Sequence, residues 1–173
     1  MDELILVDIF DNKIGTLDKA SAHAKPILHR AFSVFLYNDN KMLVQKRAQD
    51  KYHSGGLIAN TCCSHPRTDD ILGDAVTRLK FEVGIKVKAI DLHELFSFTY
   101  LTKFNENLYE YEYDHVIVGK YDGEYKINEE EVSELKWVEI DKLALDLVKN
   151  PKKYASWFLI CAPKVIEYIK NNK

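Results

Sequence analysis

Residues 31–48 carry two runs of β-branched and aromatic side chains on either side of an Asn/Asp turn. The first run is AFSVFLY, the turn is NDNK, and the second run is MLVQKRA. This pattern predicts an antiparallel hairpin, so the chain must build a β-sheet. Further strands are predicted at ELILVDIF before a turn at DNKIG, at IANTCC, at HELFSFTYLT and LYEYEYDHVIVGKY on either side of KFNEN, and at LKWVEI.

Three helices are predicted beside these strands. The clearest is DDILGDAVTRLKFEVG, residues 69–84, in which apolar side chains recur every three or four residues. Asp69 or Asp70 can cap its start, and Gly84 stands where a C-terminal cap belongs. IDKLALDLVKN and YASWFLICAPKVIEYIK predict two more helices, the second interrupted near Pro163. Together these elements indicate an α/β fold in which a mixed, mostly antiparallel sheet is sandwiched between helices.

Length and charge limit the kinds of partner that the chain can have. Its 173 residues suit a single domain over 1–173, and its net charge of −3 gives no general attraction to nucleic acid or membrane. The acidic start MDELILVDIF lacks the basic residues and long apolar stretch of a signal peptide. No apolar run reaches the roughly 18 residues of a membrane span. We expect a cytoplasmic monomer or weak dimer without nucleic-acid or membrane partners.

The segment ANTCCSHPR, residues 59–67, holds two of the chain's three cysteines. In an extended strand, Cys63 and His65 point to one face and Cys62 points to the other. Cys62, like Cys161, is then expected to be a small buried side chain. A zinc clip needs two separated ligand pairs, which the sequence lacks, and three cysteines do not suggest a disulfide framework. Cys63 is left as a candidate catalytic thiol beside His65.

Glu110 and Glu112 occupy alternate positions of a predicted strand, so they share one face, while three neighbouring tyrosines share the other. The pattern alone favours a solvated acidic face over an aromatic core. With three histidines, however, the two glutamates make a set that suits zinc, manganese or iron, provided that the fold brings them together. The histidines are His23, His29 and His65.

Four basic residues form another candidate group. Taken singly, they are ordinary solvated charges. Taken together, they could cradle a polyanion such as a diphosphate. They are Lys19, Arg47, Lys51 and Arg78.

Five segments of the chain resemble, in the same order, the type I isopentenyl-diphosphate isomerases, which belong to the Nudix superfamily. The similarity runs from about Leu17 to Trp157, with the motif-bearing core at about 28–160. Its most specific part is NTCCSHP followed by a later Glu-x-Glu. The segments are HRAFSVFLYN, KYHSGG, NTCCSHPR, AVTRLKFEVGI and YEYEYDHV.

The Nudix box, G-x5-E-x7-R-E-U-x-E-E-x-G-U, is eroded in this chain. When its last glycine falls on Gly84, its first glycine falls on Cys63 and its Arg-Glu pair falls on Thr77 and Arg78. Among its glutamate positions, only Glu82 still holds a glutamate. A diphosphohydrolase needs several of these carboxylates to bind metals and orient water, so the pattern argues against hydrolysis.

The resemblance implies a role for each candidate residue. Cys63 and Glu112 match the catalytic pair, and Tyr100 matches a tyrosine near the glutamate. A tightly bound zinc or manganese ion is expected on His23, His29, His65, Glu110 and Glu112. Glu82 matches a carboxylate that helps to hold Mg²⁺ against the substrate diphosphate. The diphosphate-binding residues are expected to be Lys19, Arg47, Lys51 and Arg78, and Trp157 is expected to line the pocket and face a carbocation.

The implied reaction interconverts isopentenyl and dimethylallyl diphosphate, for isoprenoid biosynthesis, by moving a proton across three carbons. It needs an acid and a base on opposite sides of a flat substrate. We expect the proton to come from the Glu112 side and Cys63 to act on the other face as a thiolate. The alternatives are a Nudix diphosphohydrolase, a non-catalytic metal- or ligand-binding module on the same scaffold, and a redox or zinc-clip protein. Ile58 stands where the family usually has Trp, which could change the packing behind the thiol or the shape of the pocket.

Overall fold

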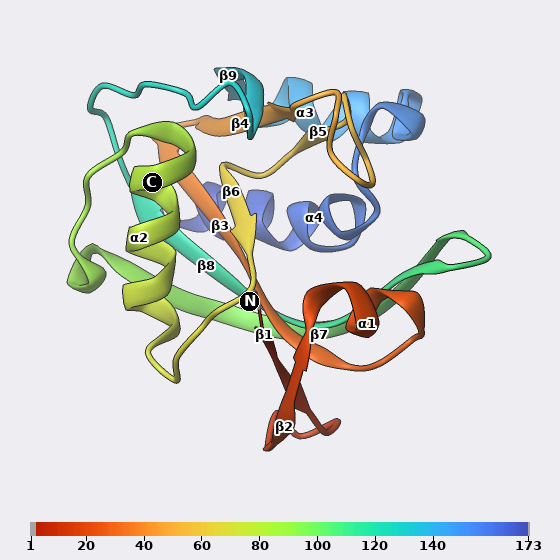
Figure 1. Ribbon diagram of the computed structural model, residues 1–173. Coiled ribbons are helices and arrows are strands. Elements are labelled where there is room, and N and C mark those ends of the chain that lie inside the picture. The colour runs from red at the N-terminus through yellow and green to blue at the C-terminus, as the bar shows by residue number, and fades with distance from the viewer. Residues whose placement is uncertain (1–2, 173) are drawn as a thin grey trace.

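The computed structural model describes residues 3–172, which form one mixed β-sheet with helices on both faces (Figure 1). The strands are β1 (Glu3–Val7), β2 (Lys13–Asp18), β3 (His29–Asn38), β4 (Lys41–Arg47), β5 (Ile58–Ala59), β6 (Cys62–Ser64), β7 (Leu92–Asn105), β8 (Leu108–Lys120) and β9 (Val132–Glu139). The helices are α1 (Lys19–Ala24), α2 (Ile71–Val83), α3 (Ile140–Lys149) and α4 (Ser156–Asn171), with two single 3₁₀ turns, η1 (Ala89–Asp91) and η2 (Pro151–Lys153).

Strand β3 lies at the centre of the sheet and is paired along both edges. One edge runs parallel to β8, and the other pairs antiparallel with β6 at residues 32–34 and with β4 at residues 36–38. This register puts Cys63 beside Ser33 and Glu112 beside His29, from opposite edges of the same strand. Two residues that are 49 positions apart in sequence are thereby brought to one region of the sheet.

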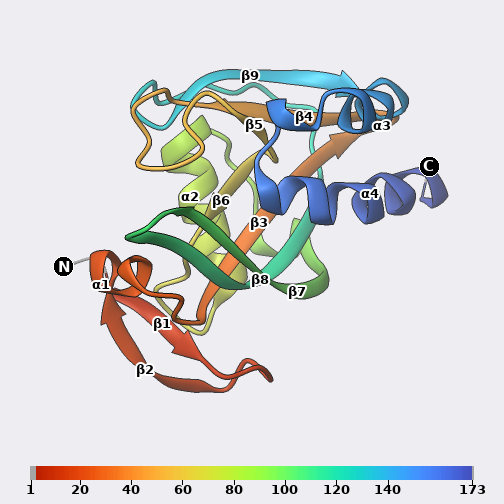
Figure 2. The same cartoon turned by 90° about the vertical axis from the view of Figure 1, so that its right-hand side faces the viewer.

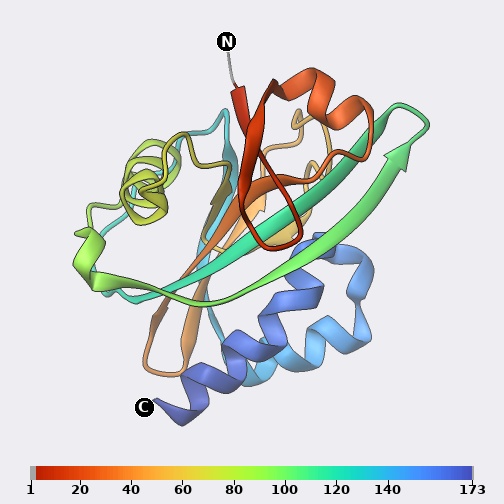
Figure 3. The same cartoon turned by 90° about the horizontal axis from the view of Figure 1, so that it is seen from below.

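Successive residues of β3 enter two different hydrophobic cores, because side chains alternate between the faces of a strand. Phe32, Val34 and Leu36 are fully buried in the core beneath α2. Phe35 and Tyr37 lie in the core that α3 and α4 form on the opposite face. Figure 3 shows the sheet between α2 on one side and α3 and α4 on the other. The predicted α/β sandwich, with a mixed sheet between helices, is confirmed.

The sheet face that α4 covers becomes polar toward the beginning of β3. There it carries His29 and Ser33 from β3 and Glu112 and Asp114 from β8, all of them buried. The β1–β2 hairpin and α1 lie at this end of the sheet, and α1 contacts β8 (Figure 2). The fold therefore gathers polar side chains at one end of an otherwise apolar layer.

The two strongest sequence predictions are confirmed. Strands β3 and β4 form the expected hairpin, with Asn38 paired with Lys41 across the turn. Helix α2 begins after Asp70, whose carboxylate accepts a hydrogen bond from the Gly73 backbone N–H at 3.0 Å. It ends at Gly84, which has a φ of 67° and so takes the left-handed conformation that glycine tolerates best.

Two predictions about the chain's two ends are wrong. The DNKIG segment is not a simple turn, since β2 begins at Lys13 and α1 follows directly after it. Helix α4 is not interrupted at Pro163 but runs through it from Ser156 to Asn171. Burial on both sides of the proline, at Phe158 and Val165 among others, holds the helix together although one backbone hydrogen bond is lost. No helix within residues 3–172 is long and apolar enough to cross a membrane.

Candidate active site

A pocket opens where the polar end of the sheet meets α1, α2 and the first turn of α4. Most of the predicted site residues line it: Lys19, Arg47, Lys51, Cys63, His65, Arg78, Glu82, Tyr100, Glu110, Glu112 and Trp157. His23 and His29 lie directly behind, next to His65 and Glu112. The structure therefore brings together side chains that the sequence spreads over 139 positions, from Lys19 to Trp157.

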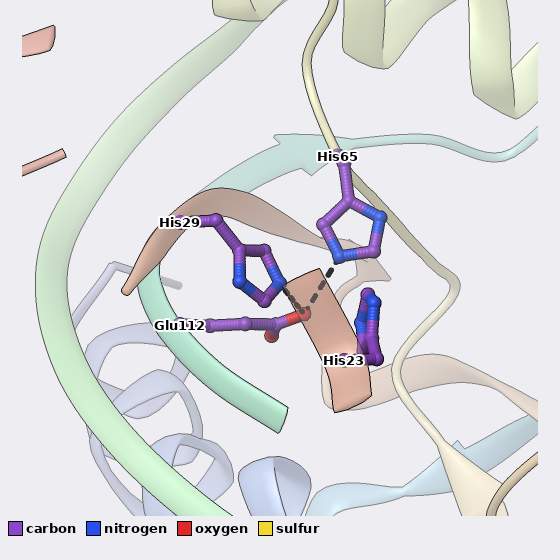
Figure 4. Close-up of side chains that lie close together, drawn as sticks. All are labelled: His23, His29, His65 and Glu112. Atoms are coloured by element: carbon purple, nitrogen blue, oxygen red, sulfur yellow. Dashed lines mark hydrogen bonds and ion pairs between the residues drawn. The ribbon is translucent and has the colours of Figure 1, made fainter. Parts of the chain in front are cut away.

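Four of these residues form a compact cluster at one wall of the pocket. His23 comes from α1, His29 begins β3, His65 follows β6, and Glu112 comes from β8. One ligand atom from each lies within 4.8 Å of the others. Figure 4 shows the three imidazoles and the carboxylate pointing toward a common centre. Four of the five expected ligand side chains thus converge, and Glu110 is not part of this cluster.

Two of the three histidines, His23 and His29, are oriented as metal ligands usually are. The Nδ1 atoms of His23 and His29 lie 2.7 and 2.8 Å from the backbone oxygens of Lys19 and Ile27, so each Nδ1–H donates to a carbonyl. These bonds place the lone pair on Nε2, which faces the centre of the cluster. His29 Nε2 is buried without a hydrogen-bond partner and lies 3.7 Å from Glu112 Oε1. Three imidazoles and one carboxylate suit zinc or manganese.

Protonation in this cluster also favours a cation site. Burial lowers the pKa of His23 and of His65 to about 4, so both rings are neutral near pH 7. Burial acts against the charged form of His29 as well, but Glu112 outweighs it and raises the His29 pKa. Burial alone would raise the pKa of Glu112, yet the nearby His29 and His65 rings hold it well below the usual value. The ionised Glu112 carboxylate and the neutral His23 and His65 rings are suitable ligands for a divalent metal.

Glu110 lies next to this cluster but has partners of its own. His53 Nε2 lies 2.9 Å from Glu110 Oε1, and the Tyr100 hydroxyl lies 3.0 Å from Glu110 Oε2. The same hydroxyl is 2.5 Å from Glu112 Oε2, so Tyr100 bridges the two carboxylates. Glu110 and Glu112 are 4% and 6% exposed, and the solvated acidic face that the pattern alone favoured is therefore wrong.

Cys62 and Cys63 separate onto opposite sides of the sheet, as their positions in the strand predict. Cys62 is fully buried in the core beneath α2, and Cys161 is fully buried in α4. Cys63 is half-buried and lines the pocket, where its Sγ accepts a hydrogen bond from Arg47 Nη1 at 3.5 Å. Burial raises the pKa of the Cys63 thiol to about 12, although the Arg47 charge acts in the other direction. A pKa this high favours the neutral thiol over the thiolate that was expected from the sequence.

We expect Cys63 to react slowly with iodoacetamide at pH 8. A thiol with a pKa of about 12 is ionised in roughly one molecule in 10⁴ at that pH, so alkylation should be at least about tenfold slower than for free cysteine. The rate should rise steadily up to about pH 11. Mass spectrometry of the labelled peptide measures it, and Cys63→Ser is the control because Cys62 and Cys161 are buried. Rapid labelling near pH 7 would show that Cys63 is a thiolate instead.

All four basic residues line the pocket, and Arg47 is buried there. Arg47 is 7% exposed, and its guanidinium carbon lies 5.2 Å from the ring centroid of Trp157. Lys51 pairs with Glu131, and Lys19 lies 4.8 Å from the centroid of the Tyr52 ring. The interpretation as ordinary solvated charges is therefore wrong for Arg47.

Glu82 and Arg78 form an ion pair one helical turn apart on α2. Glu82 is 4% exposed and lines the pocket from α2. Burial raises its pKa, while Arg78 lowers it and does not fully compensate. Such a carboxylate, held beside cations at a pocket, can serve as a ligand for a hard metal ion on a bound anion.

The spacing of residues in the sequence does not predict several of the side chains that the structure places at the site. His53 and Tyr52 come from the loop after β4, and Glu131 reaches Lys51 from the segment before β9. Asp114 is buried with Ser33 donating to its Oδ2 at 2.8 Å, and burial raises its pKa well above the usual value. Asp114 could have been suspected as the third member of an alternating acidic set, after Glu110 and Glu112.

Comparison with known proteins identifies the group to which this chain is similar. The NUDIX domain family matches residues 27–158. "Isopentenyl-diphosphate Delta-isomerase 2" of Aromatoleum aromaticum is 44% identical over 167 residues, which cover 95% of this chain and 87% of the relative. "Isopentenyl-diphosphate Delta-isomerase 2" of Photorhabdus laumondii is 47% identical over 161 residues, 91% and 89% of the two chains.

Solved structures share the fold at low sequence identity. DR0079 from Deinococcus radiodurans superimposes with a TM-score of 0.70 at 16% identity, over 98% of both chains. A MutT protein from Methanosarcina mazei superimposes with a TM-score of 0.60 at 13% identity, over 84% of this chain and 94% of that one. These likenesses concern the fold, and the Nudix-like architecture expected from the sequence is confirmed. From the domain match and the identities of 44–47% over nearly full length, the chain belongs to the Nudix superfamily and, within it, to the isopentenyl-diphosphate Delta-isomerase family.

Proposed function

We propose that the protein interconverts isopentenyl diphosphate and dimethylallyl diphosphate by adding a proton at one end of an allylic unit and removing one at the other. Relatives that carry the isomerase name match nearly the whole chain, which supports the reaction. The observation that carries the proposal is local: Cys63 and Glu112 enter one pocket from strands on opposite edges of β3. That arrangement suits a flat substrate between two proton-transferring groups.

The chemistry needs a strong acid because the alkene of isopentenyl diphosphate has no neighbouring carbonyl to activate it. Protonation of the terminal methylene makes a methyl group and a tertiary cation. Loss of a proton from the methylene between the cation and the oxygen-bearing carbon then forms the new double bond. We assign these two transfers to Glu112, with Tyr100 bonded to it, and to Cys63 on the other side. With Cys63 as a neutral thiol and Glu112 as an ionised carboxylate, Cys63 would donate the first proton and Glu112 would accept the second, which is the reverse of the direction expected from the sequence.

The cation formed between the two groups needs stabilisation without a nucleophile. The Trp157 ring is 3% exposed, lines the pocket and offers a π face, and a cation over such a face gains roughly 0.5–2 kcal/mol. Tyr100 lies 6.5 Å from Trp157 between ring centroids, so the wall there is aromatic. Limited solvent access also matters, because water would trap the cation as an alcohol.

We propose that His23, His29, His65 and Glu112 hold one divalent ion, zinc or manganese, with Glu110 as a further oxygen ligand after a change of partner from His53. When bound, the ion would fix the Glu112 carboxylate and lower the pKa of groups attached to it. The chain's own part is to present three imidazoles, two of which, His23 and His29, are oriented by backbone carbonyls. The buried Nε2 of His29, without a hydrogen-bond partner among the described residues, supports this proposal.

The diphosphate would bind at the opposite side of the pocket. Lys19, Arg47, Lys51 and Arg78 supply positive charge there, and Glu82 would help to hold Mg²⁺ against the phosphate oxygens. The alkene has no polar group of its own, so binding energy from the diphosphate must position it. The substrate is thus held at its charged end and reacts at its apolar end.

If the cluster histidines bind the metal ion, replacing one of them should lower the affinity of the protein for that ion. We expect His23→Ala to weaken zinc binding by at least about 100-fold, because removing a ligand costs no less than removing an outer-shell partner. Competition with a chromophoric chelator measures the affinity directly and needs no activity assay. His93→Ala is the matched control, since His93 pairs with Tyr168 near the C-terminal end of α4, beside Val118 of β8 and away from Glu112. Equal affinities for the two variants would remove the metal proposal.

The proposed function is tested by incubating the protein with isopentenyl diphosphate and Mg²⁺ and analysing the products. The proposal expects dimethylallyl diphosphate with no phosphate release. Release of phosphate or diphosphate would indicate a Nudix hydrolase despite the eroded box. An unchanged substrate with folded, metal-loaded protein would favour a non-catalytic binding module.

A further inference from the structure

We propose that Asn60 is a positioning residue of the isomerisation, which sets the Cys63 thiol and the Trp157 ring at a fixed distance across the pocket. This inference rests on the proposed function. Asn60 lies in the link between β5 and β6, is fully buried, and does not line the pocket itself. It therefore acts through its two neighbours and not on the substrate.

The Asn60 side chain uses both ends of its amide. Its Nδ2 donates to the Cys62 carbonyl oxygen at 2.6 Å and to the Val34 carbonyl oxygen at 3.2 Å. Its Oδ1 accepts a hydrogen bond from the Trp157 indole N–H at 3.0 Å. Two carbonyls must face the NH₂ group and a donor must face the oxygen, so the orientation of the amide is unambiguous.

The bond to Cys62 acts on the thiol because the Cys62 carbonyl belongs to the peptide that leads into Cys63. Cys62 is the partner of Val34 in the β3–β6 pair, and Asn60 bonds to both of these carbonyls. The peptide plane before Cys63 is thereby held against β3. With that plane fixed, the Cys63 side chain leaves the strand in one direction, toward the pocket.

The bond to Trp157 acts on the opposite wall of the same pocket. A buried indole N–H needs an acceptor, and Asn60 Oδ1 supplies it at the first turn of α4. Arg47 links the two walls from the pocket side, with Nη1 3.5 Å from Cys63 Sγ and its guanidinium carbon 5.2 Å from the Trp157 centroid. Asn60 connects the same two walls from outside the pocket, through its bonds to the Cys62 carbonyl and the Trp157 indole. A cation between thiol and indole is sensitive to this spacing, since a misplacement of about 1 Å can cost 10²-fold in rate.

Substitution of Asn60 should reduce turnover while leaving substrate binding nearly intact. We expect Asn60→Ala to lower kcat for isopentenyl diphosphate about 10- to 100-fold, with KM within threefold, because the diphosphate-binding cations keep their own partners. Asn60→Ser serves as a milder variant if the alanine protein folds poorly. The control is Thr61→Val, which removes two buried hydrogen bonds, to the Leu36 N–H and the Leu43 carbonyl, outside the pocket. Thr61→Val should lower Tm about as much as Asn60→Ala does, but its kcat should stay within threefold of the wild-type value.

A second readout separates positioning from general destabilisation. The chain has two tryptophans, so a ¹⁵N-labelled sample gives two indole N–H signals, and Trp157→Phe assigns them. The Trp157 signal should move in Asn60→Ala and stay in Thr61→Val, while the Trp137 signal stays in both. Wild-type kcat in folded Asn60→Ala, or an unmoved Trp157 signal, would overturn the inference while the wild-type enzyme remains an isomerase. A wild-type protein inactive toward isopentenyl diphosphate would overturn the proposed function itself.

Discussion

Replacing Cys63 with alanine is expected to lower kcat by roughly 10³-fold, in line with the loss of one group that transfers a proton in the transition state. The change removes one sulfur atom from the pocket wall and leaves Arg47 without its sulfur partner at 3.5 Å. The diphosphate-binding residues keep their positions, so KM should change little. Steady-state kinetics with isopentenyl diphosphate, together with a circular dichroism spectrum of the folded variant, measure the effect.

Cys62→Ala is the matched control for this experiment. Cys62 is the neighbouring residue, carries the same side chain, and is fully buried on the other face of the sheet. Its loss should lower Tm by a few degrees and change kcat by less than about threefold, since it only leaves a small cavity beneath α2. A near-normal rate for Cys63→Ala, or a comparable loss for Cys62→Ala, would contradict the assignment of the thiol.

Replacing Glu112 with glutamine is expected to have an equal or larger effect, roughly 10³- to 10⁴-fold in kcat. Glutamine keeps the shape of the side chain, but it cannot hold the transferable proton and carries no negative charge for His29 and His65. The expected loss therefore combines chemistry with metal binding. Measuring zinc affinity in the same variant separates them, because a variant that is reloaded with metal and still inactive has lost the proton-transferring group.

Glu110→Gln is the comparison that this second prediction needs. Glu110 lies on the same face of β8, two residues earlier, and bonds to His53 and to Tyr100. If Glu112 transfers the proton, Glu110→Gln should lower kcat by clearly less than Glu112→Gln does, about tenfold. Equal losses in both variants would mean that the pair of carboxylates bridged by Tyr100 acts as one unit. A larger loss in Glu110→Gln would reverse the two roles.

The parts of the fold that were predictable from the sequence depend on local patterns. The β3–β4 hairpin follows from two apolar runs around a turn, and α2 follows from helical spacing with Asp70 and Gly84 at its ends. The opposite orientation of Cys62 and Cys63 follows from strand alternation alone. In each case a few neighbouring residues contain all the information.

The residues that were not predictable depend on contacts between distant segments. Helix α1 has only six residues, too few for a helical period to be visible, and its position depends on packing against β8. His53 has a role only because β8 places Glu110 at 2.9 Å from it. Asn60 reads as an ordinary polar residue of the predicted IANTCC strand until α4 brings the indole of Trp157 against it.

The departure at Ile58 does not reach the pocket. Ile58 is half-buried beside the core of α3 and α4, and its carbonyl accepts a hydrogen bond from the Ala155 N–H at 2.9 Å. Among the described residues, those that line the pocket do not include it. The structure therefore places Ile58 against the start of α4, outside the described residues that line the pocket.

The measurement that tests the central claim most directly is proton NMR of isopentenyl diphosphate with the metal-loaded protein and Mg²⁺ in D₂O. Isomerisation by proton transfer predicts that dimethylallyl signals appear and that deuterium enters the methyl group formed from the terminal methylene. The same spectrum should show no loss of the diphosphate. Release of phosphate with the carbon skeleton unchanged, or no change at all with folded protein, would contradict the assignment of Cys63 and Glu112 as a proton-transferring pair.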